Sequence, residues 1–139
     1  MVDLVAIRDN HKVTFFSAGS TFNALTATAD LGVVVNAVRI DTDTGALKLD
    51  GDSDSANDSA DSVTFTDGLI MTATTVITLS AETSGILPAG KLTLSAQEGV
   101  YITDDMTGQA SSKALVINAD SDSAGTSGTL TVVTAKTVT

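Results

Sequence analysis

The sequence predicts an all-β fold, a parallel β-solenoid of about six coils with a period of 22 to 23 residues. Three observations carry this prediction: the residue usage favours strands, apolar-x-apolar triplets recur at a fixed spacing, and one ten-residue pattern occurs twice. Fixed periods between about 20 and 50 residues are typical of solenoids, in which each repeat is one coil. An antiparallel β-sandwich fibre subunit is the alternative, because short strands with frequent turns fit that fold too.

The composition favours strands over helices. The chain has 22 Thr, 14 Val and 14 Ser, but two Glu and one Pro. β-Branched residues lose side-chain freedom in a helix and pack well on a pleated surface. Because no window of a dozen residues shows a convincing 3.6-residue period, we expect helix to be nearly absent. With no Trp, one Tyr and four Phe, the core has to consist of small aliphatic side chains, which suit a narrow solenoid interior.

The repeat is most visible in two copies of one pattern, at residues 47–56 and 115–124, which start 68 positions apart. Apolar-x-apolar triplets also occur before and between them. The lead residues of all five triplets are spaced by 22, 23, 22 and 23 positions: Leu25, Leu47, Ile70, Leu92 and Leu115. Alternation of period two points one set of side chains inward and the other to solvent. We therefore expect the five lead residues to stack in one interior column.

The chain divides into one domain, residues 1–139, with an atypical beginning. Residues 1–22 hold two strand-like stretches, 4–7 and 12–16, and form a variant first coil or a docking segment. Residues 23–139 hold the repeats, with two strands in each unit. These expected strands are 24–29 and 33–40, 46–49 and 63–65, 69–72 and 76–79, 92–94 and 100–102, and 115–117 and 130–133. Glycines near the joints would allow positive φ at tight corners: Gly45, Gly68, Gly85, Gly90, Gly108, Gly125 and Gly128.

Charge and cysteine content exclude several functions. A net charge of −10 argues against nucleic acid and anionic membranes, which need a basic face, and leaves a cationic partner open. No segment approaches the roughly 20 apolar residues that span a bilayer, so we expect no membrane insertion. The first residues show no secretory signal, so the chain is either a piece of a longer secreted protein or exported by a route not encoded here. Without cysteine there is neither a disulfide nor a thiolate metal site.

Parts of the repeats carry a family resemblance. Residues 45–49 and 114–122, followed by 128–132 and 136–139, resemble the repeats of filamentous haemagglutinin-type large exoproteins. The similarity covers roughly residues 23 to 139 in degenerate motifs. It implies a right-handed parallel β-helix that forms the stalk of a secreted adhesin or a surface fibre. It does not extend to the N-terminal secretion domain of such proteins, which is not found in the first 22 residues.

An acidic loop is the candidate metal site. Carboxylates stand at loop positions 1, 3, 5, 9 and 12 and belong to Asp50, Asp52, Asp54, Asp58 and Asp61. Alternate oxygen ligands of this kind wrap Ca²⁺ in calcium loops, so the sequence predicts a possible Ca²⁺ cofactor. Ser55 replaces the usual turn glycine, and the last ligand is not the usual Glu. The alternative is a solvated acidic turn.

The second copy of the acidic pattern keeps three of these ligands: Asn118, Asp120 and Asp122. Catalysis is not expected. The pairs Asp41 and Asp43, and Asp104 and Asp105, are candidates for two-carboxylate chemistry. However, His11 is the only possible histidine base, and no Lys/Arg cluster would hold an anionic sugar. We therefore predict that these aspartates are corner residues and that the protein is not an enzyme.

The expected function is structural. Stacked coils would give a stiff rod of about 30 Å for an extracellular fibre, adhesin stalk or sheath at the cell surface. Residues 136–139 resemble a strand without a cap, so we expect a head-to-tail homo-oligomer or filament, or one part of a longer solenoid. The alternative function is a calcium-stabilised adhesion domain that binds a surface ligand.

Overall fold

The chain folds into a parallel β-solenoid, as predicted. The computed structural model describes residues 1–57, 60–125 and 127–139. Within these ranges there are fifteen strands and no helix, and every strand pair is parallel. The antiparallel sandwich alternative is therefore wrong. Since this described part contains no helix at all, it offers none that could cross a membrane.

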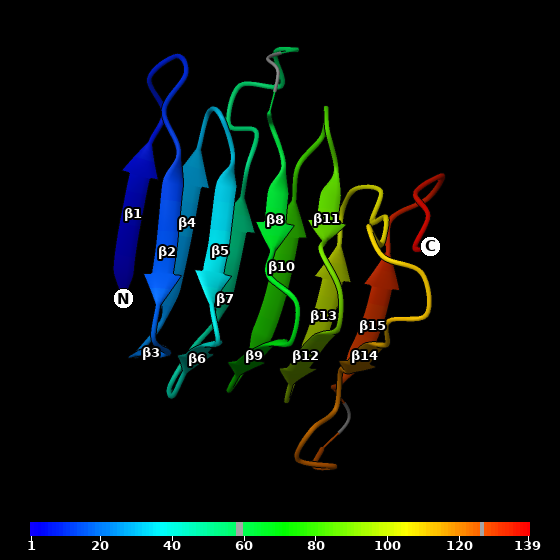
Figure 1. The fold of residues 1–139 in the computed structure, drawn as a ribbon. Coiled ribbons are helices and arrows are strands. Elements are labelled where there is room, and N and C mark those ends of the chain that lie inside the picture. The colour runs from blue at the N-terminus through cyan, green and yellow to red at the C-terminus, as the bar shows by residue number, and fades with distance from the viewer. Residues whose placement is uncertain (58–59, 126) are drawn as a thin grey trace.

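Each complete coil contributes three strands, one to each of three sheets (Figure 1). Sheet A holds six strands: β1 (Val2–Ala6), β4 (Leu25–Ala29), β7 (Leu47–Asp50), β10 (Val76–Ser80), β13 (Gly99–Ile102) and β15 (Thr129–Val132). Sheet B holds four: β2 (Val13–Ser17), β5 (Val33–Ala37), β8 (Val63–Phe65) and β11 (Ile86–Pro88). Sheet C holds five: β3 (Ser20–Phe22), β6 (Arg39–Thr42), β9 (Leu69–Ala73), β12 (Leu92–Ala96) and β14 (Leu115–Asn118).

The coil has three sides where the sequence predicted two strands. The strand expected at residues 33–40 breaks into β5 and β6, and the strands β3 and β11 were not expected. In the fifth and sixth coils, sheet B continues only as single bridges, from Ile86 to Met106 and from Met106 to Val138. The sixth coil therefore has a place in sheets A and B, whereas sheet C ends with β14 of the fifth.

The cross-section of the coil is elongated. In Figure 1 the strands of sheet A point up and those of sheet B point down, and the short strands of sheet C cross the base. Strands of sheets A and B contact each other across the interior. The chain thus reverses direction between sheets A and B at one edge, and returns through sheet C at the other.

Interior side chains form continuous columns from coil to coil. One column in sheet A contains Val2, Leu25, Leu47, Ile77, Val100 and Leu130. Its four middle members are at most 1% exposed. Complete burial of one such side chain stabilises the fold by about 1.5–3 kcal/mol. The outward residues Lys48, beside Leu47 in sheet A, and Thr93, beside Leu92 in sheet C, remain partly exposed, so the predicted alternation is confirmed.

The predicted single column of five lead residues is wrong. Leu25 and Leu47 stack in sheet A, but Leu92 and Leu115 stack in sheet C. Ile70 faces solvent and is 38% exposed, because its neighbour in the chain pairs with Leu92 instead. The long loop after β7 is the physical reason. It places Ile77, the next residue of the sheet A column, 30 positions after Leu47. Residues that continue the 22 to 23-residue spacing after Leu47 therefore lie in sheet C instead of sheet A.

The repeated ten-residue pattern forms the same local turn twice, but the two copies do not occupy equivalent positions in the coil. In both copies the last Asp accepts a hydrogen bond from the backbone two residues later: Asp54 from the Ala56 N–H at 2.9 Å, and Asp122 from the Ala124 N–H at 3.1 Å. The serines between them have φ of 57° and 54°. The first copy follows sheet A and the second follows sheet C, on opposite sides of the coil. Identical local chemistry therefore makes identical turns at inequivalent corners.

Only some of the glycines predicted at corners adopt the positive φ that was expected of them. Four of the seven predicted glycines have positive φ, namely Gly68, Gly85, Gly125 and Gly128, and Gly45, Gly90 and Gly108 do not. At Gly85, with φ of 78°, an added Cβ would lie 2.8 Å from the carbonyl oxygen of Asp105 in the next coil. Gly85 therefore permits both the backbone conformation and the close approach of two coils.

Adjacent residues of β9 provide a test of the register. Leu69→Ala should lower the free energy of unfolding by roughly 2–5 kcal/mol, because it removes a fully buried side chain and leaves a cavity. Ile70→Thr keeps a β-branched residue on the outer face and should change it by less than about 0.5 kcal/mol. Urea denaturation followed by circular dichroism measures both. The reverse order of the two effects would contradict the register.

Candidate functional site

The acidic loop between β7 and β8 is anchored at both ends by buried aspartates. Asp52 is 6% exposed, and its Oδ2 accepts a hydrogen bond of 2.7 Å from the Thr83 N–H of the next coil. Asp61 is 1% exposed, and its carbonyl oxygen accepts a hydrogen bond of 3.3 Å from the Ser84 N–H. Because both contacts cross to the following coil, the two ends of the loop tie neighbouring coils together.

The other predicted calcium ligands lie in different settings. Asp50 is on the outer face of sheet A and forms an ion pair of 3.1 Å with Lys48. The Asp54 carboxylate is exposed and closes its own turn. Asp58 lies outside the described residues. Ser55 adopts the left-handed conformation for which the sequence pattern would normally use glycine.

The fit to a cation is limited to one oxygen. Asp52 Oδ1 is buried and has no hydrogen-bond partner among the described residues, and a carboxylate oxygen of this kind suits Ca²⁺. Within the described ranges, however, no three acidic, histidine or cysteine side chains lie together as a metal site. Calcium binding by this loop therefore stays a prediction, with Asp52 as the residue that would contribute a ligand.

Carboxylates at the corner between sheets A and B replace backbone partners where the strands end. Asp30 Oδ2 accepts a hydrogen bond of 2.7 Å from the Asn10 N–H of the preceding coil. Asp104 Oδ2 accepts one of 2.9 Å from the Ala81 N–H, also of the preceding coil. Buried N–H groups need such partners, because an unpaired one costs about as much as a lost hydrogen bond. These corner aspartates therefore continue the attachment between coils beyond the sheets.

The last coil is held by two adjacent aspartates. Asp104 Oδ1 lies 2.9 Å from the Lys136 Nζ, and Asp105 Oδ1 accepts hydrogen bonds from the backbone and the hydroxyl of Thr137, at 2.8 and 2.9 Å. Burial acts to raise the pKa of Asp104, but the hydrogen bonds from Lys136, Ala81 and Thr103 outweigh it and lower that pKa. The Thr137 hydrogen bonds lower the pKa of Asp105. The ion pair with Asp104 raises the pKa of Lys136.

The remaining candidate catalytic residues, Asp41, Asp43 and His11, each contact a different neighbour. Asp41 pairs with Arg39, and Asp43 accepts a hydrogen bond of 2.8 Å from the Thr44 hydroxyl. The His11 Nδ1 lies 2.9 Å from the carbonyl oxygen of Asp9 in an exposed turn of the first coil. All of these contacts are with nearby residues of the same turn or strand, and the absence of catalysis stays a prediction.

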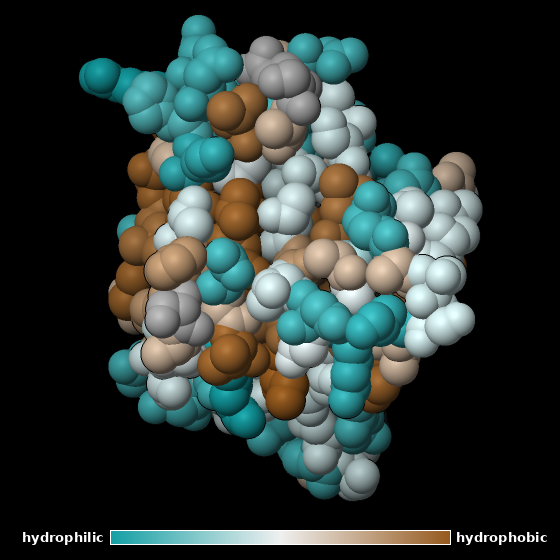
Figure 2. Space-filling model, in the orientation of Figure 1, coloured by the Kyte–Doolittle hydropathy of each residue, from teal (hydrophilic) through white to brown (hydrophobic). Residues whose placement is uncertain are grey.

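Both ends of the solenoid expose its interior columns. In the sheet A column, Val2 at one end is 38% exposed and Leu130 at the other is 47% exposed, while the four residues between them are buried. Brown, hydrophobic side chains lie along the left margin of Figure 2, the side of the N-terminal coil, and the loops above and below are teal. The two end faces are therefore the places where the described chain leaves core residues open.

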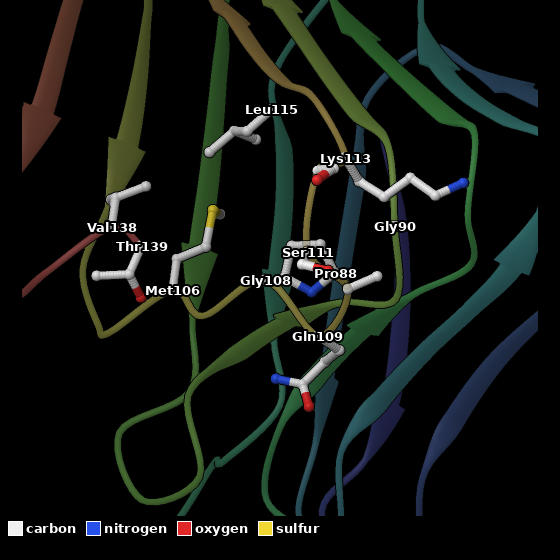
Figure 3. Close-up of a pocket in the computed structure, with 12 residues that line it drawn as sticks. Pro88, Gly90, Met106, Gly108, Gln109, Ser111, Lys113, Leu115, Val138 and Thr139 are labelled. Atoms are coloured by element: carbon white, nitrogen blue, oxygen red, sulfur yellow. The ribbon is translucent and has the colours of Figure 1, made fainter.

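At the C-terminal end the open core forms a cavity of about 490 Å³. Figure 3 shows Met106 and Leu115 pointing toward each other across it, with Val138 at one side. Leu115 is 38% exposed, although its partner Leu92 is fully buried. The expectation that Leu115 lies in the interior like Leu92 is thus corrected. It faces inward, but no sixth strand of sheet C covers it in the described residues.

The chain matches no family model, no curated protein and no solved structure. The resemblance to filamentous haemagglutinin-type repeats therefore stays a prediction from the residues themselves. Function has to be inferred from the geometry of the coils and their ends.

Calcium binding can be measured by isothermal titration. We expect heat with Ca²⁺ that exceeds the heat with Mg²⁺, because Ca²⁺ accepts oxygen ligands in variable geometry whereas Mg²⁺ requires a nearly ideal octahedron. Asp52→Ala should remove this heat, whereas Asp122→Ala in the second loop serves as the control and should keep it. The absence of heat at about 1 mM Ca²⁺, within the range of extracellular modules, would leave the loop as a solvated turn.

Acid should loosen the last coil. A carboxyl whose pKa is lower in the folded protein stabilises it above the ordinary value of about 3.9 and loses this effect as the pH falls through the folded pKa. We therefore expect hydrogen exchange at Met106 and Thr139, whose N–H groups bond across the last coil, to quicken below about pH 4 relative to Leu49. Asp104→Asn with Asp105→Asn should remove the pH dependence. An unchanged acid response in that variant would contradict the role of these carboxylates.

Proposed function

We propose that this chain is a structural module of an extracellular fibre, adhesin stalk or sheath, built by end-to-end stacking of β-coils. The observation that carries the proposal is the state of the two end faces. The same apolar columns that are buried through the middle coils emerge exposed at both ends, together with the unpaired edges of β1 and β15. Such edges template pairing with another strand.

Stiffness follows from the way the coils hold each other. Within the described chain each inner strand has a parallel partner on either side, so its backbone groups are paired in both directions. Leu47, for example, packs between Leu25 and Ile77. Bending the rod would separate columns and break hydrogen bonds on one side. A solenoid of this kind therefore provides length and stiffness.

The outer surface supports a place outside the cell, as the predicted family resemblance also does. The outer face of sheet A carries a column with three threonines, Thr26, Thr78 and Thr131, and the loops are rich in serine and aspartate. The chain has a net charge of −10 and no cysteine. Hydroxyls and excess negative charge keep such a rod hydrated and discourage side-by-side association. In this proposal the protein has a structural role and no catalytic one.

Assembly through the ends is tested with two substitutions in β15. Light scattering after size-exclusion chromatography should show species above the monomer mass that increase with concentration. Leu130→Lys places a charge in the exposed interior column and should shift the protein to monomer. Thr131→Lys, its neighbour on the outer face, is the matched control and should leave assembly unchanged. A wild-type chain that stays monomeric at high concentration would favour one part of a longer solenoid over a self-assembling subunit.

A further inference from the structure

We propose that two copies join in phase, so that β1 of one copy pairs with β15 of the next and each junction leaves sheet C one strand short. This inference rests on the proposed end-to-end assembly and specifies its partner, a second copy of this chain. A different junction is conceivable, in which β1 continues the spiral on β14. The two junctions differ by a rotation of one sheet about the rod axis, because the last contact of the sixth coil in the described residues is the Val138 bridge in sheet B.

The shape of the coil favours the in-phase junction. Sheets A and B run in opposite directions and meet at a wide reversal, whereas sheet C crosses the base of the coil (Figure 1). In the first coil the reversal spans residues 7–12, and the corner between sheets B and C spans only residues 18–19. A rotation by one sheet would set the two-residue corner on the five-residue reversal 133–137. Only the in-phase junction places like corners on like corners.

The interior columns match across an in-phase junction. In sheet A, Leu130 of one copy would meet Val2 of the next, and Val132 would meet Leu4. In sheet B, one column runs through Val13, Val33, Val63, Ile86, Met106 and Val138, so Val138 would meet Val13. Each contact joins two apolar side chains that are at least partly exposed at the ends. Stacking would therefore bury apolar surface at every one of these positions.

Charge permits contact at the ends more readily than along the sides. The side-chain charges of residues 1–22 cancel, because Arg8 and Lys12 balance Asp3 and Asp9, so the net charge of −10 lies on the rest of the chain. In residues 129–139 the single charged side chain is Lys136, which is already paired with Asp104. Where sheets A and B meet, the two ends therefore carry few unpaired charges and can be desolvated at low cost; Asp120 and Asp122 follow β14 in sheet C, which the in-phase junction leaves without a direct neighbour. Two rods side by side would instead oppose like charges.

The cavity lies beside β14, the edge strand of sheet C in the described residues. An in-phase junction puts β3 of the next copy two strand spacings above β14, about 9.5 Å away, and leaves Leu115 without a direct neighbour. The cavity beside Met106 and Leu115 is then a recurring opening in one face of the fibre, once per copy. This asymmetry of the three sheets distinguishes the in-phase fibre from a seamless one.

Engineered cysteines test the junction, because the natural chain has none. Directly paired residues on neighbouring strands lie about 4.8 Å apart, within the Cα separation that a disulfide spans. Asp3 and Thr131 occupy the same outward column at opposite ends of one chain, so they can meet only across a junction. Asp3→Cys with Thr131→Cys should give a ladder of disulfide-linked oligomers under mild oxidation. Asp3→Cys with Val116→Cys, the outward position of β14, should not.

Each outcome has one meaning. A ladder from the Asp3 and Val116 pair alone would overturn the in-phase junction while leaving end-to-end assembly intact. Oligomers by light scattering without a ladder from either pair would also overturn it. Monomers throughout, with both double variants folded by circular dichroism, would overturn the proposed assembly itself. A ladder from the Asp3 and Thr131 pair, absent from each single-cysteine variant, is the result that the in-phase junction requires.

Discussion

The structure depends on one constraint: no coil of this chain has a core of its own. A single turn of three short strands encloses only one layer of side chains, and each layer is buried by the layers before and after it. Leu49, for instance, is fully buried because Ala27 and Leu79 lie against it in the neighbouring coils. Stability in such an array is approximately a sum of coil and interface terms, so the middle coils gain two interfaces and the end coils one.

The corners follow from the same constraint. Strand hydrogen bonds attach the coils to each other along the sheets, but the ladder stops wherever the chain turns. There, aspartates such as Asp30, Asp52 and Asp104 accept hydrogen bonds from backbone N–H groups of an adjacent coil. A carboxylate reaches across a corner where no carbonyl is available, and a charged acceptor makes the stronger hydrogen bond. Part of the acidity of the protein is thus structural, and it concentrates at the corners rather than on the end faces.

Local pattern predicted the strands well, whereas register depended on loop lengths that local pattern does not contain. The period-two alternation expected for residues 100–102 agrees with the structure, in which Val100 and Ile102 are buried and Tyr101 is exposed. It failed at Ile70, where Leu69 takes the inward position once the loop before it has set the offset. The strand β11 was missed because it ends in Pro88, which lacks an N–H. Pro88 still accepts a hydrogen bond through its carbonyl from Gln109.

The candidate site shows the same division. An acidic loop could be located from the sequence, and the Asp-Ser turn at Asp54 and its repeat at Asp122 depend only on neighbouring residues. The burial of Asp52 could not be predicted, because its partner Thr83 belongs to the next coil. The exposure of Leu115 could not be predicted either, because it depends on whether a further strand of sheet C covers β14. Contacts between coils thus could not be predicted from the spacing of residues along the sequence.

The two ends differ in how they tolerate a missing neighbour. The first coil keeps Phe15 and Phe22 in edge-to-face contact, with ring centroids 6.4 Å apart, so bulky side chains fill part of its interior. The last coil has no such rings, and its segment 136–139 is attached mainly through Asp104, Asp105 and the Met106 bridge. A coil held by corner hydrogen bonds over an open cavity gains more from a docked neighbour than one that already fills its own interior. Docking of a second copy, as proposed above, would therefore stabilise the C-terminal coil of each copy most, because it adds neighbours in sheets A and B although sheet C stays one strand short.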